Sequence, residues 1–265
     1  MYTPFDLTGR CAVVTGGNGG IGLGMARALL ASGAKVAIWG SNPDKTERER
    51  ARLADECGDA ARVSAFVCDV GDEAQVDAGF AASVAALGRV DACFANAGVA
   101  GFDTPLTQMS LDEFRRVQRI NVEGVFLTLR AAARHMIEHG QGGSLVATAS
   151  TAALEGAARN SHYGASKGAV TAFVRALAVE LARHRIRVNA VIPGMVGTPA
   201  SKAQFDAATR VFGQIDRDSR LKSQASGRFF DLMLKAGQWQ SAGRLWRNTV
   251  VGAEENEREL LWNGS

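Results

Sequence analysis

Apolar residues recur along the chain in two alternating patterns. Short runs of β-branched and other apolar residues, typical of buried strands, are separated by longer segments with apolar residues at every third or fourth position. The short runs predict six strands, at residues 11–15, 35–39, 62–68, 90–95, 143–150 and 186–192. The longer segments predict five helices, at residues 21–32, 43–57, 72–87, 110–139 and 162–184.

Strands that alternate with helices in this way predict a parallel sheet, because each strand returns to the sheet through a right-handed helical crossover. The expected fold is therefore α/β, a doubly wound parallel sheet (Rossmann fold) in a single domain. Ligands of such sheets bind outside the carboxyl ends of the strands. We expect residues 1–198 to form the dinucleotide-binding and catalytic domain, followed by an atypical C-terminal segment at 199–265.

A glycine-rich turn joins the first predicted strand to the first predicted helix. Five glycines lie between Gly16 and Gly22, in the spacing Gly16-x-x-x-Gly20-x-Gly22. Such a turn leaves backbone N–H groups at a helix N-terminus, and the missing Cβ atoms let a pyrophosphate approach closely. The turn predicts a dinucleotide ligand, although a glycine turn without a ligand stays open on this feature alone.

Composition and charge narrow the function classes. The chain has 265 residues, 46% of them hydrophobic and 22% charged, and a formal net charge of +3, which is ordinary for a soluble globular protein. This charge gives no reason to expect nucleic acid or a membrane surface as partner. The N-terminus lacks a basic start and an apolar core, and no long apolar run follows, so we expect a cytoplasmic protein.

The four cysteines show no Cys-x-x-Cys pairing, and three of them fall in predicted strands. A free thiol in such a position acts as a small apolar side chain. We therefore expect reduced cysteines in the core, with no metal site.

Tyr163 and Lys167 lie four residues apart on the last predicted helix and therefore share one face. A lysine ammonium beside a phenol favours the phenolate and lowers the tyrosine pKa, which makes Tyr163 a usable general acid or base. Ser150, at the end of the fifth predicted strand, would present its hydroxyl to the same substrate oxygen. Taken alone, Tyr-x-x-x-Lys is more often an ordinary pair on an amphipathic helix.

The whole set of motifs resembles the short-chain dehydrogenase/reductase family. The motifs that carry the resemblance, over residues 6–199, are Thr15-Gly16-x-x-x-Gly20-Ile21-Gly22, Asn96-Ala97-Gly98, Asn121, Ser150, Tyr163-x-x-x-Lys167 and Pro193-Gly194. The resemblance implies an oxidoreductase that transfers a hydride between NAD(P) and a ketone or secondary alcohol. It implies that Tyr163 is the acid/base, that Ser150 orients the substrate oxygen, and that Lys167 lowers the tyrosine pKa and holds the nicotinamide ribose.

The expected cofactor contacts extend over the carboxyl ends of several strands. They are Gly16, Asn18, Gly20, Ile21, Gly22, Ser41, Asn42, Asp69, Val70, Asn96, Gly98, Tyr163, Lys167, Pro193, Val196 and Thr198. Within this set the resemblance implies an adenine contact for Asp69, with a solvated turn residue as the alternative. It also implies that Asn96 holds the central strands together and that Thr198 contacts the nicotinamide carboxamide.

Asn121 completes the expected catalytic set. Asn121 and Gly124 are poor helix formers inside the predicted helix at 110–139, so we expect a local distortion that releases a backbone carbonyl. The resemblance implies that Asn121 holds a water that links Lys167 to solvent. The alternative is an ordinary polar residue on a helix.

The cofactor is expected to be NADP, with NAD as the alternative. NAD enzymes of this fold usually place an acid at the end of the second strand to bind the ribose hydroxyls, and here Gly40, Ser41 and Asn42 offer no carboxylate. A helix N-terminus with Lys45 and Arg48 nearby would receive a phosphate. Many NADP-dependent members of the family that the chain resembles carry a basic residue at positions 19 and 41, so Gly19 and Ser41 argue against NADP.

The resemblance ends near Pro199, and residues 200–265 contain no proline and three of the four tryptophans. A dinucleotide-binding protein that has lost turnover with its C-terminal pocket wall is therefore the alternative function.

Candidate pocket residues are mostly apolar and suggest a small uncharged carbonyl or alcohol substrate; they are Phe102, Ala152, Leu154 and Met195. The family associates through its fourth and fifth helices, which predicts a homodimer, with a tetramer as the alternative.

Overall fold

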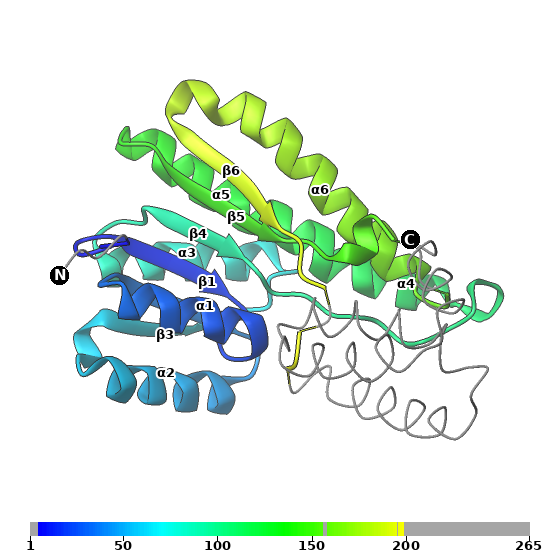
Figure 1. The fold of residues 1–265 in the computed structure, drawn as a ribbon, viewed down its shortest axis with the longest axis horizontal. Coiled ribbons are helices and arrows are strands. Elements are labelled where there is room, and N and C mark those ends of the chain that lie inside the picture. Colours follow the sequence, from blue (N-terminus) through cyan, green and yellow to red (C-terminus); the bar gives the residue numbers. More distant parts are fainter. Residues whose placement is uncertain (1–4, 156–157, 195, 199–265) are drawn as a thin grey trace, which may run out of the picture. The chain divides into compact units, whose positions relative to one another are not determined.

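The computed structural model describes residues 5–155, 158–194 and 196–198. The chain divides into two compact units, one through Pro193 and a second that begins at Gly194. All helices and strands given below belong to the first unit (Figure 1). Met195 and the expected features of residues 199–265 lie outside the described residues.

A six-stranded parallel sheet forms the centre of the first unit. Its strands are β1 (Cys11–Thr15), β2 (Lys35–Gly40), β3 (Val63–Val67), β4 (Ala92–Ala95), β5 (Gly143–Thr148) and β6 (Ile186–Val191). Their order is β3-β2-β1-β4-β5-β6, so the direction of winding reverses between β1 and β4. This is the doubly wound fold that the alternating pattern predicts, and its ligand crevice lies at the reversal.

Two apolar clusters bury the two faces of the sheet, and β1 contributes to both because successive side chains of a strand point to opposite faces. Val14 packs in the cluster with α1 (Gly20–Ala31) and α2 (Pro43–Cys57). Val13 packs in the cluster with α3 (Glu73–Leu87), α5 (Gly124–His139) and α6 (Ser161–Leu181). Figure 1 shows α1 and α2 together beside β1 and β3.

Two helices, α2 and α4, begin at the capping residues that the sequence offers. Asn42 accepts a hydrogen bond from the Lys45 N–H (2.8 Å) and precedes Pro43 in the first turn of α2. Ser110 caps α4 (Leu111–Gln118) by accepting from the Glu113 N–H (3.1 Å). These contacts position α2 and α4 beside the carboxyl edge of the sheet.

The helix predicted at 110–139 is interrupted by a π-helical segment, Arg119–Glu123. The poor helix formers at 121 and 124 predict this distortion. Within the segment, the buried Asn121 side-chain amide pairs both backbone polar groups of Val99 in the loop after β4. It accepts from the Val99 N–H (2.8 Å) and donates to the Val99 carbonyl (2.9 Å). The segment therefore fixes this loop where two helices meet.

Asn96 connects the strands on either side of β4. Its Nδ2 donates to the Thr15 carbonyl at the end of β1 (3.0 Å), and its Oδ1 accepts from Thr148 Oγ1 at the end of β5 (3.1 Å). One amide thus pairs polar groups of both neighbouring strands at the point where the ladder hydrogen bonds end.

The four cysteines are free thiols. Cys11, Cys68 and Cys93 are buried, and burial raises the pKa of Cys68 and of Cys93 to about 12. These two thiols are therefore protonated near neutral pH. No helix in the described part of the chain is long and apolar enough to cross a bilayer.

Candidate active site

The glycine turn lies between the end of β1 and the start of α1 and is packed too tightly for side chains. A Cβ at Gly22 would collide with the Gly16 carbonyl and with the Asn96 amide. Gly16 itself has a φ of 64°, in the left-handed region that favours glycine. No side chain caps the start of α1 and no acid occupies its first turn, so the residues present suit a bound pyrophosphate.

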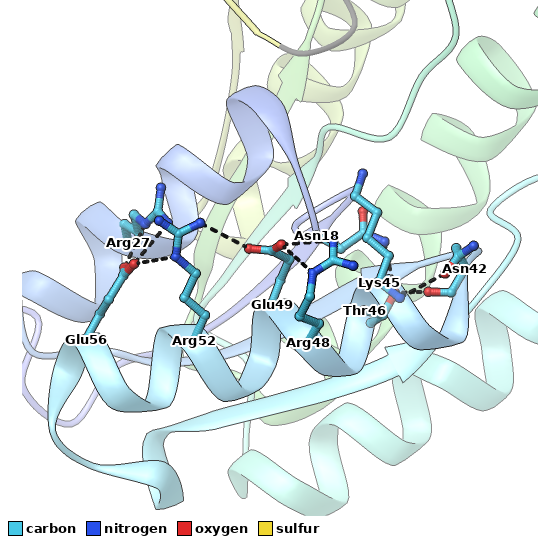
Figure 2. A network of polar contacts seen from close by, with 9 residues as sticks. All are labelled: Asn18, Arg27, Asn42, Lys45, Thr46, Arg48, Glu49, Arg52 and Glu56. Atoms are coloured by element: carbon cyan, nitrogen blue, oxygen red, sulfur yellow. Dashed lines mark hydrogen bonds and ion pairs between the residues drawn. The ribbon is translucent and has the colours of Figure 1, made fainter.

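The end of β2 lies next to this turn, and here too the packing leaves no room for a side chain. Gly40 is buried, and a Cβ there would collide with the Asn18 amide. Asn18 Nδ2 donates to Thr46 Oγ1 (2.8 Å), which in turn donates to the Asn42 carbonyl (2.6 Å). Thr46 therefore links Asn18 in the turn to the backbone of Asn42 at the start of α2 (Figure 2). Ser41 is exposed beside them.

Lys45 points from α2 toward the glycine turn. Its ammonium lies 2.7 Å from the position that a Gly19 Cβ would take. The arginines farther along α2 are paired with carboxylates, Arg48 with Glu49 (3.2 Å) and Arg52 with Glu56 (3.0 Å) (Figure 2). Within the described residues Lys45 has no carboxylate partner, so its charge is available beside the glycine turn.

Three of the expected catalytic residues come from α6 and from the turn after β5. Lys167 is 3% exposed and donates from Nζ to the Thr148 carbonyl (2.8 Å), while its Nζ lies 5.7 Å from the centre of the Tyr163 ring. Ser150 follows two residues after Thr148, and its Oγ accepts from the Ala152 N–H (3.2 Å). The structure thus brings Lys167 beside Tyr163 and attaches it to the strand that ends next to Ser150.

The turn after Ser150 also lies against the start of α6. A Cβ at Gly164, the residue after Tyr163, would lie 3.2 Å from the Ala152 carbonyl oxygen. The Thr151 N–H donates to the Pro193 carbonyl (3.0 Å), which joins the same turn to the segment after β6. Both contacts hold the Ser150 turn at the carboxyl edge, next to Tyr163.

The environment of Lys167 has an electrostatic cost. Burial lowers the pKa of its ammonium from 10.5 to about 8. The group is still mainly protonated at neutral pH, and the Thr148 carbonyl provides a hydrogen-bond partner for the charge.

Asn121 and Gly98 lie next to this pair. A Cβ at Gly98 would lie 3.1 Å from Asn121 Oδ1 and 3.4 Å from Lys167 Nζ, so the chain passes close to both groups. Asn121 Nδ2 also donates to Ser166 Oγ (3.0 Å). The side-chain oxygen and nitrogen of Asn121 therefore have protein partners, while its expected water contact stays a prediction.

Asp69 has a partner that the sequence reasoning missed. Its Oδ2 forms an ion pair with Arg119 on the π-helical segment (2.9 Å), and its Oδ1 accepts from the Gly71 N–H (3.0 Å). Val70 packs against Gly124, where a Cβ would lie 2.7 Å from Val70 Cγ2. A basic residue two positions before Asn121 was the available signal, but nothing in the local pattern relates it to residue 69.

Other expected site residues are less closely placed. Phe102 and Leu154 are 67% and 73% exposed, so their part in a substrate pocket stays a prediction. Val196 and Thr198 belong to the second unit, so their cofactor contacts stay predictions. Within the described residues, no group of three or more His, Cys, Asp or Glu side chains is arranged to hold a metal ion.

Comparison with known proteins gives the family. A family model described as short chain dehydrogenase matches residues 10–209. The 2,5-dichloro-2,5-cyclohexadiene-1,4-diol dehydrogenase of Sphingobium indicum is 40% identical over 201 residues, which cover 76% of this chain and 78% of that protein. The chain belongs to the short-chain dehydrogenase family. It is therefore an oxidoreductase that uses NAD(P) and acts on alcohols and ketones.

Solved structures of short-chain dehydrogenases agree with this assignment. A short-chain type dehydrogenase/reductase from Mycobacterium marinum matches with a TM-score of 0.73 and 37% identity, over 77% of this chain and 80% of that one. An NAD+-bound xylitol dehydrogenase matches with a TM-score of 0.69 and 37% identity, over 72% of each chain. The alternative of a dinucleotide-binding protein without turnover is not favoured.

The lowered pKa of Lys167 predicts a pH-dependent stability. Between about pH 8 and 10.5 the unfolded chain binds more protons at this group than the folded chain, so the cost of burying the charge disappears as pH rises through this window. We expect the stability advantage of Lys167→Met over the wild type to shrink by about 3 kcal/mol between pH 7 and pH 10. Urea unfolding at both pH values measures this change. Lys35→Met, at an exposed lysine, serves as control. A stability advantage of Lys167→Met that does not change with pH would contradict the lowered pKa of Lys167.

Proposed function

We propose that Tyr163 is the general acid/base of this short-chain dehydrogenase, that Ser150 orients the substrate oxygen, and that Lys167 favours the phenolate of Tyr163. The observation that supports the proposal best is the buried ammonium of Lys167, which lies beside the Tyr163 ring and is held by the Thr148 carbonyl. A positive charge in this place stabilises a phenolate more than a phenol.

When bound, NAD(P) supplies the hydride to the carbonyl carbon, or accepts it from the alcohol carbon. In the direction of reduction, Tyr163 donates its hydroxyl proton to the substrate oxygen as the C=O double bond becomes a C–O single bond. Ser150 donates a hydrogen bond to that oxygen and stabilises its developing negative charge. In the direction of oxidation, the phenolate of Tyr163 accepts the proton of the alcohol.

The cofactor proposed for this site is NADP, with NAD as the alternative. Gly40 and the exposed Ser41 place no acid at the end of β2 that would repel a 2′-phosphate. The ammonium of Lys45 supplies a cation beside Gly19, where the sequence itself has no basic residue. This contact from α2 offsets the argument against NADP.

The substrate class proposed is a small uncharged ketone or secondary alcohol. The exposed Phe102 and Leu154 offer apolar contacts near Ser150 and the loop after β4. The Sphingobium relative acts on a six-membered ring diol by its name, so cyclic alcohols are suitable probes. The location proposed is the cytoplasm, where free thiols such as those of the four cysteines stay reduced.

The catalytic assignment predicts the behaviour of Tyr163→Phe. This variant lacks only the hydroxyl that acts on the substrate oxygen, so its turnover of cyclohexanol or cyclohexane-1,4-diol should fall at least about 100-fold. Its affinity for the dinucleotide should stay within about threefold of the wild type, because the ring is unchanged. Absorbance of the reduced nicotinamide measures turnover, and fluorescence titration measures binding. Equal losses in both would remove Tyr163 from the acid/base role.

The proposed phosphate contact predicts a cofactor-selective effect at Lys45. Wild-type protein should bind NADPH at least as tightly as NADH, and Lys45→Gln should weaken NADPH binding about tenfold while NADH binding changes less than about twofold. The control is Arg48→Gln, three residues along α2, whose charge is already paired with Glu49. Titration of all three proteins with both nucleotides is the measurement. A wild-type preference for NADH, or equal losses for both nucleotides, would reverse the proposal.

The assembly proposed is a homodimer formed through the faces of α5 and α6. Small exposed residues on α6 permit close approach of a second copy; they are Ala165, Ala169, Ala172 and Ala176. Ala172→Arg should convert the dimer to a monomer, because it places a long charged side chain on this face. The control is Ala81→Arg on the exposed side of α3. Light scattering gives the mass of each protein, and a stable tetramer in the wild type would contradict the dimer.

A further inference from the structure

His162 is a buried titratable side chain that the proposed mechanism does not use. It is 0% exposed and lies in the first turn of α6, directly before Tyr163. Neither ring nitrogen has a hydrogen-bond partner among the described residues. Buried polar groups without partners are rare and costly, so an arrangement that leaves both nitrogens unpaired calls for a second arrangement in which one of them is paired.

The nearest acceptor of His162 is the carboxylate of Glu113 in the first turn of α4. Nε2 lies 3.6 Å from Glu113 Oε1, just beyond hydrogen-bond distance. The same Oε1 accepts from the Phe102 N–H (2.8 Å), and Arg116 donates to both carboxylate oxygens. These partners, with Arg116 first, lower the pKa of Glu113 to about 2, so the acceptor is ionised at neutral pH.

The loop between β4 and α4 passes directly over the imidazole. Gly101 has a φ of 78°, and a Cβ there would collide with His162 Nε2. The next residue, Phe102, carries the N–H that is bonded to Glu113 and has a side chain that is 67% exposed. His162, Glu113 and this loop therefore form one contact in which a small shift of the loop or of α4 changes the distance between Nε2 and Oε1.

The same loop already has a second attachment to the segment before α6. Arg159, in a left-handed conformation with a φ of 63°, donates to Asp103 Oδ1 (2.8 Å), and its carbonyl accepts from the Thr104 N–H (3.1 Å). This outer attachment is solvent-exposed and formed, whereas the inner one at His162 is buried and open. The outer attachment therefore holds residues 103 and 104, whereas the buried contact between His162 and Glu113 is still open.

We propose that His162 is a positioning residue that closes the loop of residues 98–110 over the substrate. In the closed arrangement the imidazole donates from Nε2 to Glu113 Oε1. Because Glu113 also accepts from the Phe102 N–H, it then joins the loop to the turn of α6 that carries Tyr163. No proton is transferred in this step. The inference rests on the proposed function, because that function places the substrate at the carboxyl end of β4, where this loop begins.

The test compares four full-length proteins: the wild type, His162→Leu, His162→Gln and Thr128→Val. Leucine removes both ring nitrogens, whereas the glutamine amide retains a donor near the place of Nε2. Thr128 is the matched control, because its buried hydroxyl also lacks a partner among the described residues but belongs to α5. Cyclohexanol oxidation with NADP gives KM and kcat, and thermal unfolding gives stability.

We expect His162→Leu to raise KM for cyclohexanol about tenfold, because the closed arrangement loses one hydrogen bond to a charged group. Its kcat should change less than about threefold. His162→Gln should restore most of KM. Thr128→Val should keep the wild-type KM and unfold at or above the wild-type temperature, since it replaces an unpaired buried polar group by an apolar one. An unchanged KM in His162→Leu, or equal effects of leucine and glutamine, would overturn the proposal.

Hydrogen exchange at the Phe102 amide separates this proposal from the proposed function. In protein without substrate, His162→Leu should speed this exchange roughly tenfold relative to the wild type and to His162→Gln, because the closed arrangement protects the amide. Absence of turnover in the wild type would count against the proposed function alone. Equal exchange in all four proteins would overturn the role of His162 whether or not cyclohexanol is turned over.

Discussion

The buried ammonium of Lys167 is the interaction on which the active site depends. Its hydrogen bond to the Thr148 carbonyl joins α6 to the end of β5, so Tyr163 and Ser150 are positioned by the same contact. Burial makes this charge costly and lowers the pKa of Lys167 to about 8, and such perturbed groups are concentrated at functional sites. An exposed lysine at the same helical spacing would have less influence on Tyr163, because solvent would screen it.

Two asparagine side chains provide hydrogen-bond partners at the carboxyl ends of the strands. Strands end there and leave backbone groups without ladder partners. Asn96 pairs with groups at the ends of β1 and β5, and Asn121 pairs with both polar groups of Val99. Asn121 occupies a π-helical segment, a distortion often found at functional sites. The loop that passes His162 contains Val99, so the same amide fixes its first residues.

Charge is distributed unevenly along α2, and this bears on the cofactor. Arg48, Arg52 and Arg27 are paired with glutamates along the outer side of α1 and α2, whereas Lys45 lies beside the glycine turn. Ion pairs between exposed groups contribute little to stability, but they neutralise the field of the arginines. Of the two basic residues that the sequence places near the start of α2, Arg48 is therefore paired with Glu49, whereas Lys45 lies beside Gly19 without a carboxylate partner in the described part of the chain.

The succession of strands and helices along the chain and the parallel sheet could be predicted from the sequence. The signals that carry them, which are apolar periodicity, helix caps and glycine turns, each involve only a few neighbouring residues. The distortion at Asn121 was also predictable, since two poor helix formers lie close together. Contacts between distant segments were not, as the ion pair of Asp69 with Arg119 and the approach of Lys45 to Gly19 show. The unpaired His162 beside Glu113 belongs to this second group. Its burial arises from packing of the loop after β4 against α6, and no local pattern encodes which polar side chain such packing will enclose.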